Sequence, residues 1–250
     1  MSLPRKKTYL VTGGTHGIGR ACVEALAAQG GRVLFIGRDE EAGSQLAERL
    51  PGCTFVRADI ADAEACRAAA NQAIDLGEGS LDGLVNNAGI TLRKAFVETS
   101  LQQWDEVFDV NVRSAFLFTR AALPALIRAK GSVVAVSSVA GLVGAEGLVA
   151  YTASKAALIG MMRSLAIECG RDVRFNTVCP GQIGTRMMTK ALSDEQNVAR
   201  LLKGIPAGRI GDPRDVALAV VWLLSEMSAY VNGAVFPIDG GETSGFASAG

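Results

Sequence analysis

The chain has little of what metal sites and disulfide frameworks require. Its 250 residues include a single histidine, His16, and five scattered cysteines without a C-x-x-C pair. A histidine-based metal site is therefore not expected. An odd number of dispersed cysteines is typical of free thiols in a reducing compartment rather than of a disulfide or zinc framework.

Charge and hydropathy argue against further classes of protein. Lys plus Arg and Asp plus Glu are balanced at 25 each, so no excess of positive charge would attract nucleic acid or an anionic membrane. The sequence lacks any run of about 18 apolar residues, and no signal-peptide stretch follows its short basic N-terminus. We expect a cytoplasmic protein with neither a membrane nor a nucleic-acid partner.

Strand-like and helix-like patterns alternate along the whole chain. Short runs rich in Val, Ile and Phe predict strands buried on both faces at residues 8–12, 32–36, 53–57, 84–86, 132–137, 173–178 and 235–238. Apolar residues spaced three and four apart predict helices at residues 18–29, 40–49, 63–76, 101–128, 151–168 and 213–225.

This alternation predicts one Rossmann-type domain over residues 1–250. The expected fold is α/β, a doubly wound parallel sheet of about seven strands with helices on both faces. The irregular residues 182–211 begin beyond the end of a predicted strand, where ligands of such folds bind. This segment is therefore the candidate substrate lid.

The turn after the first predicted strand is rich in glycine. Residues 11–19 read VTGGTHGIG and lead into a helical pattern. Glycines at such a turn let the backbone approach a pyrophosphate, while the helix N-terminus supplies free N–H groups. The spacing of Gly13, Gly17 and Gly19 is G-x-x-x-G-x-G rather than the common G-x-G-x-x-G, so a plain tight turn is the alternative.

Two further strand ends are candidates for contact with a dinucleotide. Asp59 and Ile60 follow the third predicted strand, where the Asp59 carboxylate could accept a hydrogen bond from an adenine amino group or cap the next helix. Asn87, Ala88 and Gly89 follow the fourth. There the backbone of Asn87 or Ala88 could line the adenosine ribose, and Gly89 would permit close approach; a simple turn is the alternative.

Tyr151 and Lys155 are four residues apart in a helical pattern, so both side chains point from one face. A phenol has a pKa of about 10, which a nearby cation lowers. Tyr151 could then exchange a proton with an alcohol or ketone while hydride moves to or from a nicotinamide. Ser138, at the end of the fifth predicted strand, could hold the substrate oxygen, with Ser137 as the competing choice.

Together these motifs resemble the short-chain dehydrogenase/reductase family, in its shorter single-domain branch. The glycine-rich turn, Asn87-Ala88-Gly89, Ser138, the Tyr151–Lys155 pair and Pro180-Gly181 fall in the family's order and spacing. The resemblance implies an NAD(P)-dependent oxidoreductase that acts on the CH–OH group of a small alcohol or on a ketone, and a homotetramer. The alternative is a catalytically inactive dinucleotide-sensing module of the same fold.

The resemblance also assigns roles to residues. It selects Ser138 over Ser137, gives Asn111 a place in a water-linked proton relay to Lys155, and has Lys155 bind the nicotinamide ribose. The expected catalytic residues are Asn111, Ser138, Tyr151 and Lys155. The expected coenzyme-binding residues are Gly13, Thr15, His16, Gly17, Ile18, Gly19, Arg38, Asp59, Ile60, Asn87, Ala88, Gly89, Tyr151, Lys155, Pro180, Gly181, Ile183 and Thr185, and no metal is expected.

The choice between NADP and NAD depends on the end of the second predicted strand. A carboxylate there would bind the ribose 2′-hydroxyl, whereas an arginine would bind a 2′-phosphate. By resemblance the acidic position falls on Gly37, and Arg38 follows it, which favours NADP. Asp39, one residue further, and His16, where NADP-preferring relatives often carry Arg or Lys, point the other way. We expect NADP, with NAD as the alternative.

Overall fold

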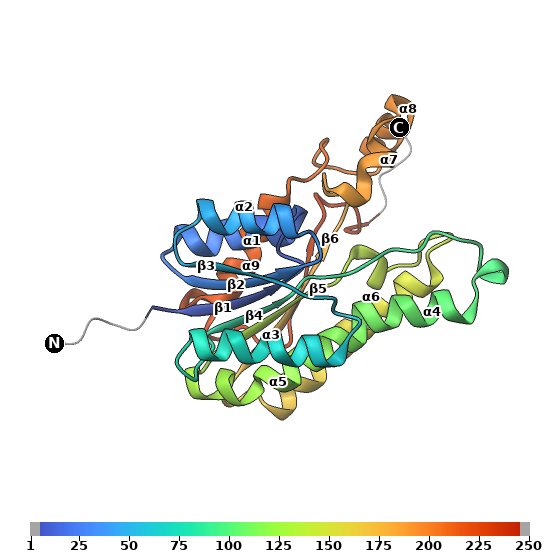
Figure 1. Cartoon of the computed structure of the whole chain (residues 1–250). Coiled ribbons are helices and arrows are strands. Elements are labelled where there is room, and N and C mark those ends of the chain that lie inside the picture. Colours follow the sequence, from blue (N-terminus) through green and yellow to red (C-terminus); the bar gives the residue numbers. More distant parts are fainter. Residues whose placement is uncertain (1–5, 246–250) are drawn as a thin grey trace.

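A seven-stranded parallel sheet forms the centre of the computed structural model, which describes residues 6–245 (Figure 1). The strands lie in the order β3-β2-β1-β4-β5-β6-β7, and every neighbouring pair is parallel. Their bounds are β1 Thr8–Thr12, β2 Arg32–Gly37, β3 Cys53–Arg57, β4 Gly83–Asn86, β5 Ser132–Val136, β6 Arg174–Pro180 and β7 Val235–Ile238. The predicted doubly wound α/β fold is confirmed.

Helices cover both faces of this sheet (Figure 1). One layer holds α1 (Gly17–Ala28), α2 (Glu40–Arg49) and α9 (Pro213–Leu224). The other layer holds α3 (Ala63–Leu76), α5 (Ser114–Ala129) and α6 (Val149–Glu168). Successive strand residues point to opposite faces, so Leu10 and Val11 of β1 belong to the two different hydrophobic cores. The five inner strands are buried on both faces, which explains why they lack polar alternation. The edge strands β3 and β7 are only partly buried, so the prediction of burial on both faces is wrong for these two.

The predicted helix over residues 101–128 contains an irregular turn. Helix α4 (Leu101–Phe108) is followed by the π-helical segment η2 (Asp109–Arg113), and α5 continues from Ser114. The wider turn places Asn111, 1% exposed, beneath the carboxyl edge of the sheet. A π-helical turn within a helix often marks a functional site, and apolar spacing alone does not reveal it.

The segment 182–211 holds more regular structure than the sequence predicted. It forms the 3₁₀ turn η4 (Arg186–Met188) and the helices α7 (Thr189–Leu192) and α8 (Glu195–Lys203). Helix α8 has no buried residue and stands away from the sheet with α7 (Figure 1). The helices stay attached to the carboxyl edge through Ile183, which is buried and forms a parallel bridge with Gly211.

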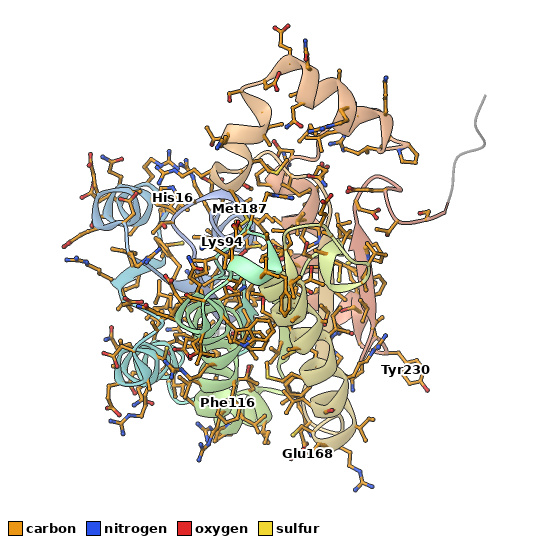
Figure 2. All side chains as sticks on the ribbon, turned by 90° about the vertical axis from the view of Figure 1, so that its right-hand side faces the viewer. His16, Lys94, Phe116, Glu168, Met187 and Tyr230 are labelled. Atoms are coloured by element: carbon orange, nitrogen blue, oxygen red, sulfur yellow. The ribbon has the colours of Figure 1, made fainter. Side chains whose placement is uncertain are left out.

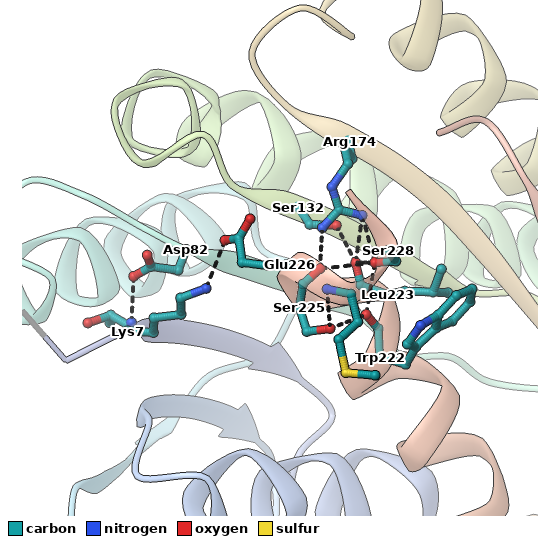
Figure 3. Close-up of polar contacts among 11 residues, drawn as sticks. Lys7, Asp82, Ser132, Arg174, Trp222, Leu223, Ser225, Glu226 and Ser228 are labelled. Carbon is teal, nitrogen blue, oxygen red and sulfur yellow. Dashed lines mark hydrogen bonds and ion pairs between the residues drawn. The ribbon is translucent and has the colours of Figure 1, made fainter. Parts of the chain in front are cut away.

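Arg174, at the start of β6, fixes this strand to the end of α9 (Figure 3). Its guanidinium donates to the carbonyls of Leu223 at 2.9 Å and Ser225 at 3.1 Å, and to the Ser228 hydroxyl at 3.0 Å. The last carbonyls of a helix lack partners within it, and a cation there is also favoured by the helix dipole. Arg174 thereby holds β6, which ends at the candidate site, in place.

Three further observations concern residues 6–245. All five cysteines carry free thiols. No cluster of three or more His, Cys, Asp or Glu side chains in this range is arranged to hold a metal ion. Within the same range, none of the helices combines the length and apolar character that crossing a membrane would need.

Candidate active site

The glycine-rich turn joins β1 to α1. Gly13 and Gly17 adopt positive φ angles of 66° and 52°, which L side chains rarely allow. A Cβ on Gly19 would lie 2.1 Å from the Gly13 carbonyl oxygen, so the turn closes only without one. His16 precedes α1 but its side chain makes no cap, and the first turn of α1 holds no acidic residue. The first N–H groups of α1 are thus available to an anion such as a pyrophosphate.

Asn87 and Ala88 brace this turn from the neighbouring strand end. The Asn87 amide nitrogen donates to the carbonyls of Thr12 at 2.9 Å and Gly13 at 3.1 Å. The backbone N–H groups of Asn87 and Ala88 both donate to the Thr12 hydroxyl, at 3.0 and 3.1 Å. A Cβ on Gly13 would meet the Ala88 Cα at 2.9 Å. These two residues therefore shape the floor beneath the turn, and the Asn87 side chain is committed to that support.

The end of β2 carries the residues predicted to read the coenzyme ribose. Thr15 is buried against Gly37, where a Cβ would lie 2.6 Å from the threonine methyl group. Arg38 is exposed. The Asp39 carboxylate accepts from the Ala42 N–H at 3.1 Å and contacts the His16 ring at 2.7 Å, and these two hydrogen bonds lower its pKa. Asp39 thus caps α2, and its carboxylate is already engaged by the Ala42 N–H and the His16 ring.

The end of β3 brings Asp59 and Ile60 to the same edge. The Asp59 carboxylate accepts from the Ala61 N–H at 3.0 Å, which closes a local turn. Helix α3 is capped instead by Asp62, whose carboxylate accepts from the Glu64 N–H at 2.9 Å. The alternative of Asp59 as the cap of this helix is therefore wrong.

Ser138 and Tyr151 meet through their hydroxyl groups. Ser138 precedes the 3₁₀ turn η3 (Val139–Gly141) and its hydroxyl oxygen accepts from the Ala140 N–H at 3.1 Å. The Ser138 side chain also approaches the Tyr151 phenol and acts to lower the pKa of that group. Ser137 is buried and donates to the Lys155 carbonyl at 2.8 Å. The structure therefore directs Ser138, and not Ser137, toward the phenol.

Lys155 lies deep beneath Tyr151. Its side chain is 4% exposed, and its Nζ donates to the Val136 carbonyl at 2.9 Å and lies 5.7 Å from the centroid of the Tyr151 ring. Burial lowers the pKa of Lys155 to about 8. Burial also raises the pKa of Tyr151, and the nearby Ser138 side chain only partly opposes this. The shift in the pKa of Tyr151 is therefore opposite to the lowering expected from a nearby cation. Burial disfavours the charged form of each group, the phenolate of Tyr151 and the ammonium of Lys155.

Asn111 connects the loop after β4 to α6. Its Oδ1 accepts from the Ile90 N–H at 2.8 Å, and its Nδ2 donates to the Ile90 carbonyl at 3.0 Å and to the Ser154 hydroxyl at 2.9 Å. A Cβ on Gly89 would lie 3.1 Å from Asn111 Oδ1 and 3.2 Å from Lys155 Nζ. The missing side chain of Gly89 thus leaves room between the amide and the ammonium.

The end of β6 and the segment after it form the last part of the candidate site at the carboxyl edge of the sheet. Pro180 is buried at the end of β6, and Gly181 packs so closely that a Cβ would lie 2.7 Å from Asp239 Cβ. Thr185 reaches the glycine-rich turn, where its methyl group lies 3.1 Å from the position of a Cβ on Gly17. The start of the predicted lid therefore lies across from the first turn of α1.

Comparison with known proteins identifies the family. The family model described as enoyl-(acyl carrier protein) reductase matches residues 13–243. The chain belongs to the short-chain dehydrogenase/reductase family. It is 40% identical to the 3-oxoacyl-(acyl-carrier-protein) reductase FabG of Aquifex aeolicus, over 94% of this chain and 96% of that protein. It is 39% identical to 2-(S)-hydroxypropyl-CoM dehydrogenase 3 of Xanthobacter autotrophicus, over 96% and 97%.

A solved structure of this family is also closely similar. The Pseudomonas aeruginosa RhlG/NADP active-site complex has a TM-score of 0.89 to this chain at 34% identity, covering 94% of this chain and 96% of that one. The chain is thus a short-chain dehydrogenase/reductase, an oxidoreductase that transfers hydride between NAD(P)(H) and an alcohol or ketone. The predicted family and reaction class are confirmed.

The carboxyl edge of the sheet also includes a contact that the sequence did not predict. Arg186 approaches His16 with its Nη1 at 2.7 Å and Asp39 at 3.3 Å. The three residues lie far apart along the chain, and each reads by itself as an ordinary surface group. Only the fold brings them together, so no local pattern in the sequence could have revealed this cluster.

Proposed function

We propose that Tyr151 is the general acid and base of this oxidoreductase, with Ser138 and Lys155 as its partners. The observation that carries the proposal is the approach of the Ser138 side chain to the Tyr151 phenol, beside the buried Lys155 Nζ, which lies 5.7 Å from the centroid of the phenol ring. Two hydroxyl groups that approach each other in this way can both contact one substrate oxygen. A side chain in this position can move a proton while the other holds the oxygen in place.

The chain's residues then divide the work of carbonyl reduction. A bound nicotinamide would supply the hydride to the carbonyl carbon of a ketone, or accept it from the hydroxyl-bearing carbon of an alcohol. Ser138 donates a hydrogen bond to the substrate oxygen, and Tyr151 transfers its proton to that oxygen as the alcohol forms. Lys155, with Asn111 linked to it through a water relay, restores the proton to Tyr151. In the opposite direction Tyr151 accepts the proton of the alcohol, and the positive charges of Lys155 and the oxidised ring favour the phenolate.

The carboxyl edge of the sheet fits the coenzyme. Gly13, Gly17 and Gly89 lack a Cβ that would press on Ala88, Thr185 and Asn111, so the backbone segments at this edge come close together, and the uncapped start of α1 suits the pyrophosphate of a dinucleotide. We place adenine beside Asp59 and Ile60, and the nicotinamide beside Pro180, Gly181, Ile183 and Thr185. The other proposed contacts are Thr15, His16, Ile18, Gly19, Asn87, Ala88, Tyr151 and Lys155.

NADP is the coenzyme that these residues favour. Arg38 is exposed at the end of β2, where a 2′-phosphate would bind, and Gly37 offers no carboxylate for a ribose hydroxyl. Asp39 is engaged by the Ala42 N–H and by His16. The similar Pseudomonas structure is a complex with NADP. NAD remains the alternative coenzyme, and the dissociation constants of both, measured before and after Arg38→Ala, test the choice.

The remaining proposals concern the lid and the assembly. Residues 182–211 begin at the coenzyme edge, and their exposed helices suit a lid over the substrate. Phe116 and Ile127 of α5 and Ile167 of α6 expose apolar side chains, which supports a homotetramer. Free thiols support a cytoplasmic location. Light scattering of the purified protein tests the tetramer.

Substitution of Tyr151 tests the proposed chemistry. Oxidation of NADPH is followed with a panel of ketones, and Tyr151→Phe is expected to lower kcat by at least about 100-fold, since general acid–base catalysis contributes that much. The dissociation constant of NADPH should change by less than about threefold. Tyr230→Phe is the matched control, because Tyr230 is fully exposed. Undiminished turnover in Tyr151→Phe would overturn the proposal, whereas binding without turnover in the wild type would favour the sensing module.

A further inference from the structure

Three polar side chains from distant parts of the chain meet beside the glycine-rich turn, at the carboxyl edge of the sheet. The Asp39 carboxylate lies 2.7 Å from the His16 ring nitrogen Nε2. Arg186 Nη1 lies 2.7 Å from the same nitrogen and 3.3 Å from Asp39 Oδ2. Figure 2 shows His16 beside Met187, the residue that follows Arg186. The cluster therefore joins the glycine-rich turn, the start of α2 and the start of the lid.

This cluster lies beside the carboxyl end of β2, where a 2′-phosphate is expected to bind. His16 belongs to the turn that receives the pyrophosphate, and Asp39 follows Arg38 at the carboxyl end of β2. Thr185 packs against Gly17, so the next residue, Arg186, starts beside the glycine-rich turn. The adenosine ribose of a bound dinucleotide lies near the end of the second strand of such a fold. Arg186 thus reaches from the candidate lid to Asp39, next to the expected position of the ribose.

The charges of the cluster are unbalanced without Arg186. Asp39 carries a negative charge at a position where a 2′-phosphate would bring about two more, and like charges close together repel. One carboxylate oxygen of Asp39 is held by the Ala42 N–H, so the carboxylate cannot turn away without uncapping α2. Among the described residues, Arg186 makes its contacts through Nη1 alone. Its Nε and Nη2 hydrogens remain to pair with an oxyanion.

We propose that Arg186 is a coenzyme-selectivity residue that binds the 2′-phosphate from the lid and offsets the charge of Asp39. This inference rests on the proposed preference for NADP. Arg38 approaches the phosphate from the sheet, and Arg186 approaches it from the opposite side. Because Arg186 opens the η4 turn, a 2′-phosphate would also hold the start of the lid against the glycine-rich turn. NADP(H) would then close the lid better than NAD(H).

The test compares ligands that differ only in the 2′-phosphate. Dissociation constants of NADPH and NADH, and of 2′,5′-ADP and 5′-ADP, are measured for the wild type, Arg186→Gln and Arg186→Lys. Arg186→Gln should weaken NADPH and 2′,5′-ADP by about tenfold or more, because one charge-assisted contact is lost. NADH and 5′-ADP should change by less than about threefold, and Arg186→Lys should retain part of the affinity. Arg200→Gln, an exposed arginine of α8 that contacts Asn197, should change none of the four.

A second substitution tests the role of Asp39. Asparagine caps helices as well as aspartate does, so Asp39→Asn removes the charge and keeps the start of α2. Added to Arg186→Gln, it should restore part of the lost NADPH affinity. Absence of any recovery would overturn the charge offset.

The outcomes separate this inference from the function on which it rests. Equal losses for NADPH and NADH, or no loss for either, would overturn the role of Arg186 while leaving the NADP preference intact. A wild type that binds NADH as tightly as NADPH would overturn the NADP preference itself, and this inference with it. The ADP pair lacks nicotinamide, so a loss seen there cannot come from changes at the catalytic end.

Discussion

The side-chain amide of Asn111 donates a hydrogen bond to the hydroxyl oxygen of Ser154 at 2.9 Å. The Ser154 hydroxyl in turn donates to the Tyr151 carbonyl at 2.7 Å. A side chain of the π-helical turn is therefore linked directly to the first turns of α6, which carry Tyr151 and Lys155. The same amide closes two hydrogen bonds with the backbone of Ile90. Asn111 thus positions α6, the helix that carries Tyr151 and Lys155, against the loop that follows β4.

Asn111→Ala should both destabilise the protein and impair turnover. The substitution leaves the partly buried backbone N–H and carbonyl of Ile90 without the Asn111 partner, and an unsatisfied buried group costs about 1–3 kcal/mol. We expect the free energy of unfolding in urea to fall by about 2–4 kcal/mol. Because Asn111 positions other residues, kcat should fall more than the KM for the ketone rises. Ser154→Ala is the milder comparison, and unfolding unchanged in Asn111→Ala would contradict this account.

The neighbouring serines at the end of β5 should behave in opposite ways. Ser138→Ala removes the hydroxyl that contacts Tyr151, so we expect kcat to fall by about 100-fold or more with stability nearly unchanged. Ser137→Ala removes a buried hydrogen bond to the Lys155 carbonyl, so stability should fall by about 1 kcal/mol with most activity retained. Initial rates and urea unfolding of both variants check the pair. A greater loss of activity in Ser137→Ala would reverse the assignment.

Much of the fold could be predicted from the sequence because burial leaves a local trace. The five inner strands are enclosed on both faces and are therefore mostly apolar. All seven strands, including the partly exposed edge strands β3 and β7, appear in the structure within about two residues of their predicted bounds. The π-helical turn at Asn111 left no such trace, since apolar spacing is similar in the two kinds of helix. Helix α8 was missed because it buries no residue and packs against little.

Some features of the candidate site could likewise be predicted from the sequence, and others could not. Tyr151, Lys155 and Ser138 could be predicted because their chemistry follows from side-chain type and spacing, and the structure brings them together. The partners of Asp39 could not be predicted from the sequence, because His16 and Arg186 are brought next to it only by the fold. The shift in the pKa of Tyr151 was also mispredicted. Spacing shows that a cation is near but not how deeply both groups are buried.

Activity should require glycine at position 89 but not at position 160. A Cβ on Gly89 would press on Asn111 Oδ1 and Lys155 Nζ at 3.1 and 3.2 Å, so Gly89→Ala should lower kcat by about tenfold or more through displacement of Lys155. Gly160, inside α6, would place a Cβ in open space. Gly160→Ala should therefore stabilise the helix by up to about 1 kcal/mol without loss of activity. Equal effects of the two substitutions on kcat would contradict the close packing at Gly89.

The buried ammonium group of Lys155 should lower the free energy of unfolding at neutral pH. Burial lowers the pKa of its ammonium group from an ordinary 10.5 to about 8, so the unfolded chain holds this proton more tightly than the folded one. Below about pH 8 the full penalty is present, about 3 kcal/mol by linkage. Between about pH 8 and 10.5 the unfolded state binds more protons, so the penalty shrinks as the pH rises.

Lys155→Met should therefore be inactive but more stable at pH 7. The lost hydrogen bond to the Val136 carbonyl offsets about 1 kcal/mol, which leaves a gain of about 1–2 kcal/mol. Urea unfolding at pH 7 and at pH 10 measures the difference, which should vanish or change sign at the higher pH. Lys203→Met, at an exposed lysine of α8, should show no such dependence. A gain that stays constant between the two pH values would mean that the buried ammonium is not its source, and that Lys155 remains charged in the folded protein throughout.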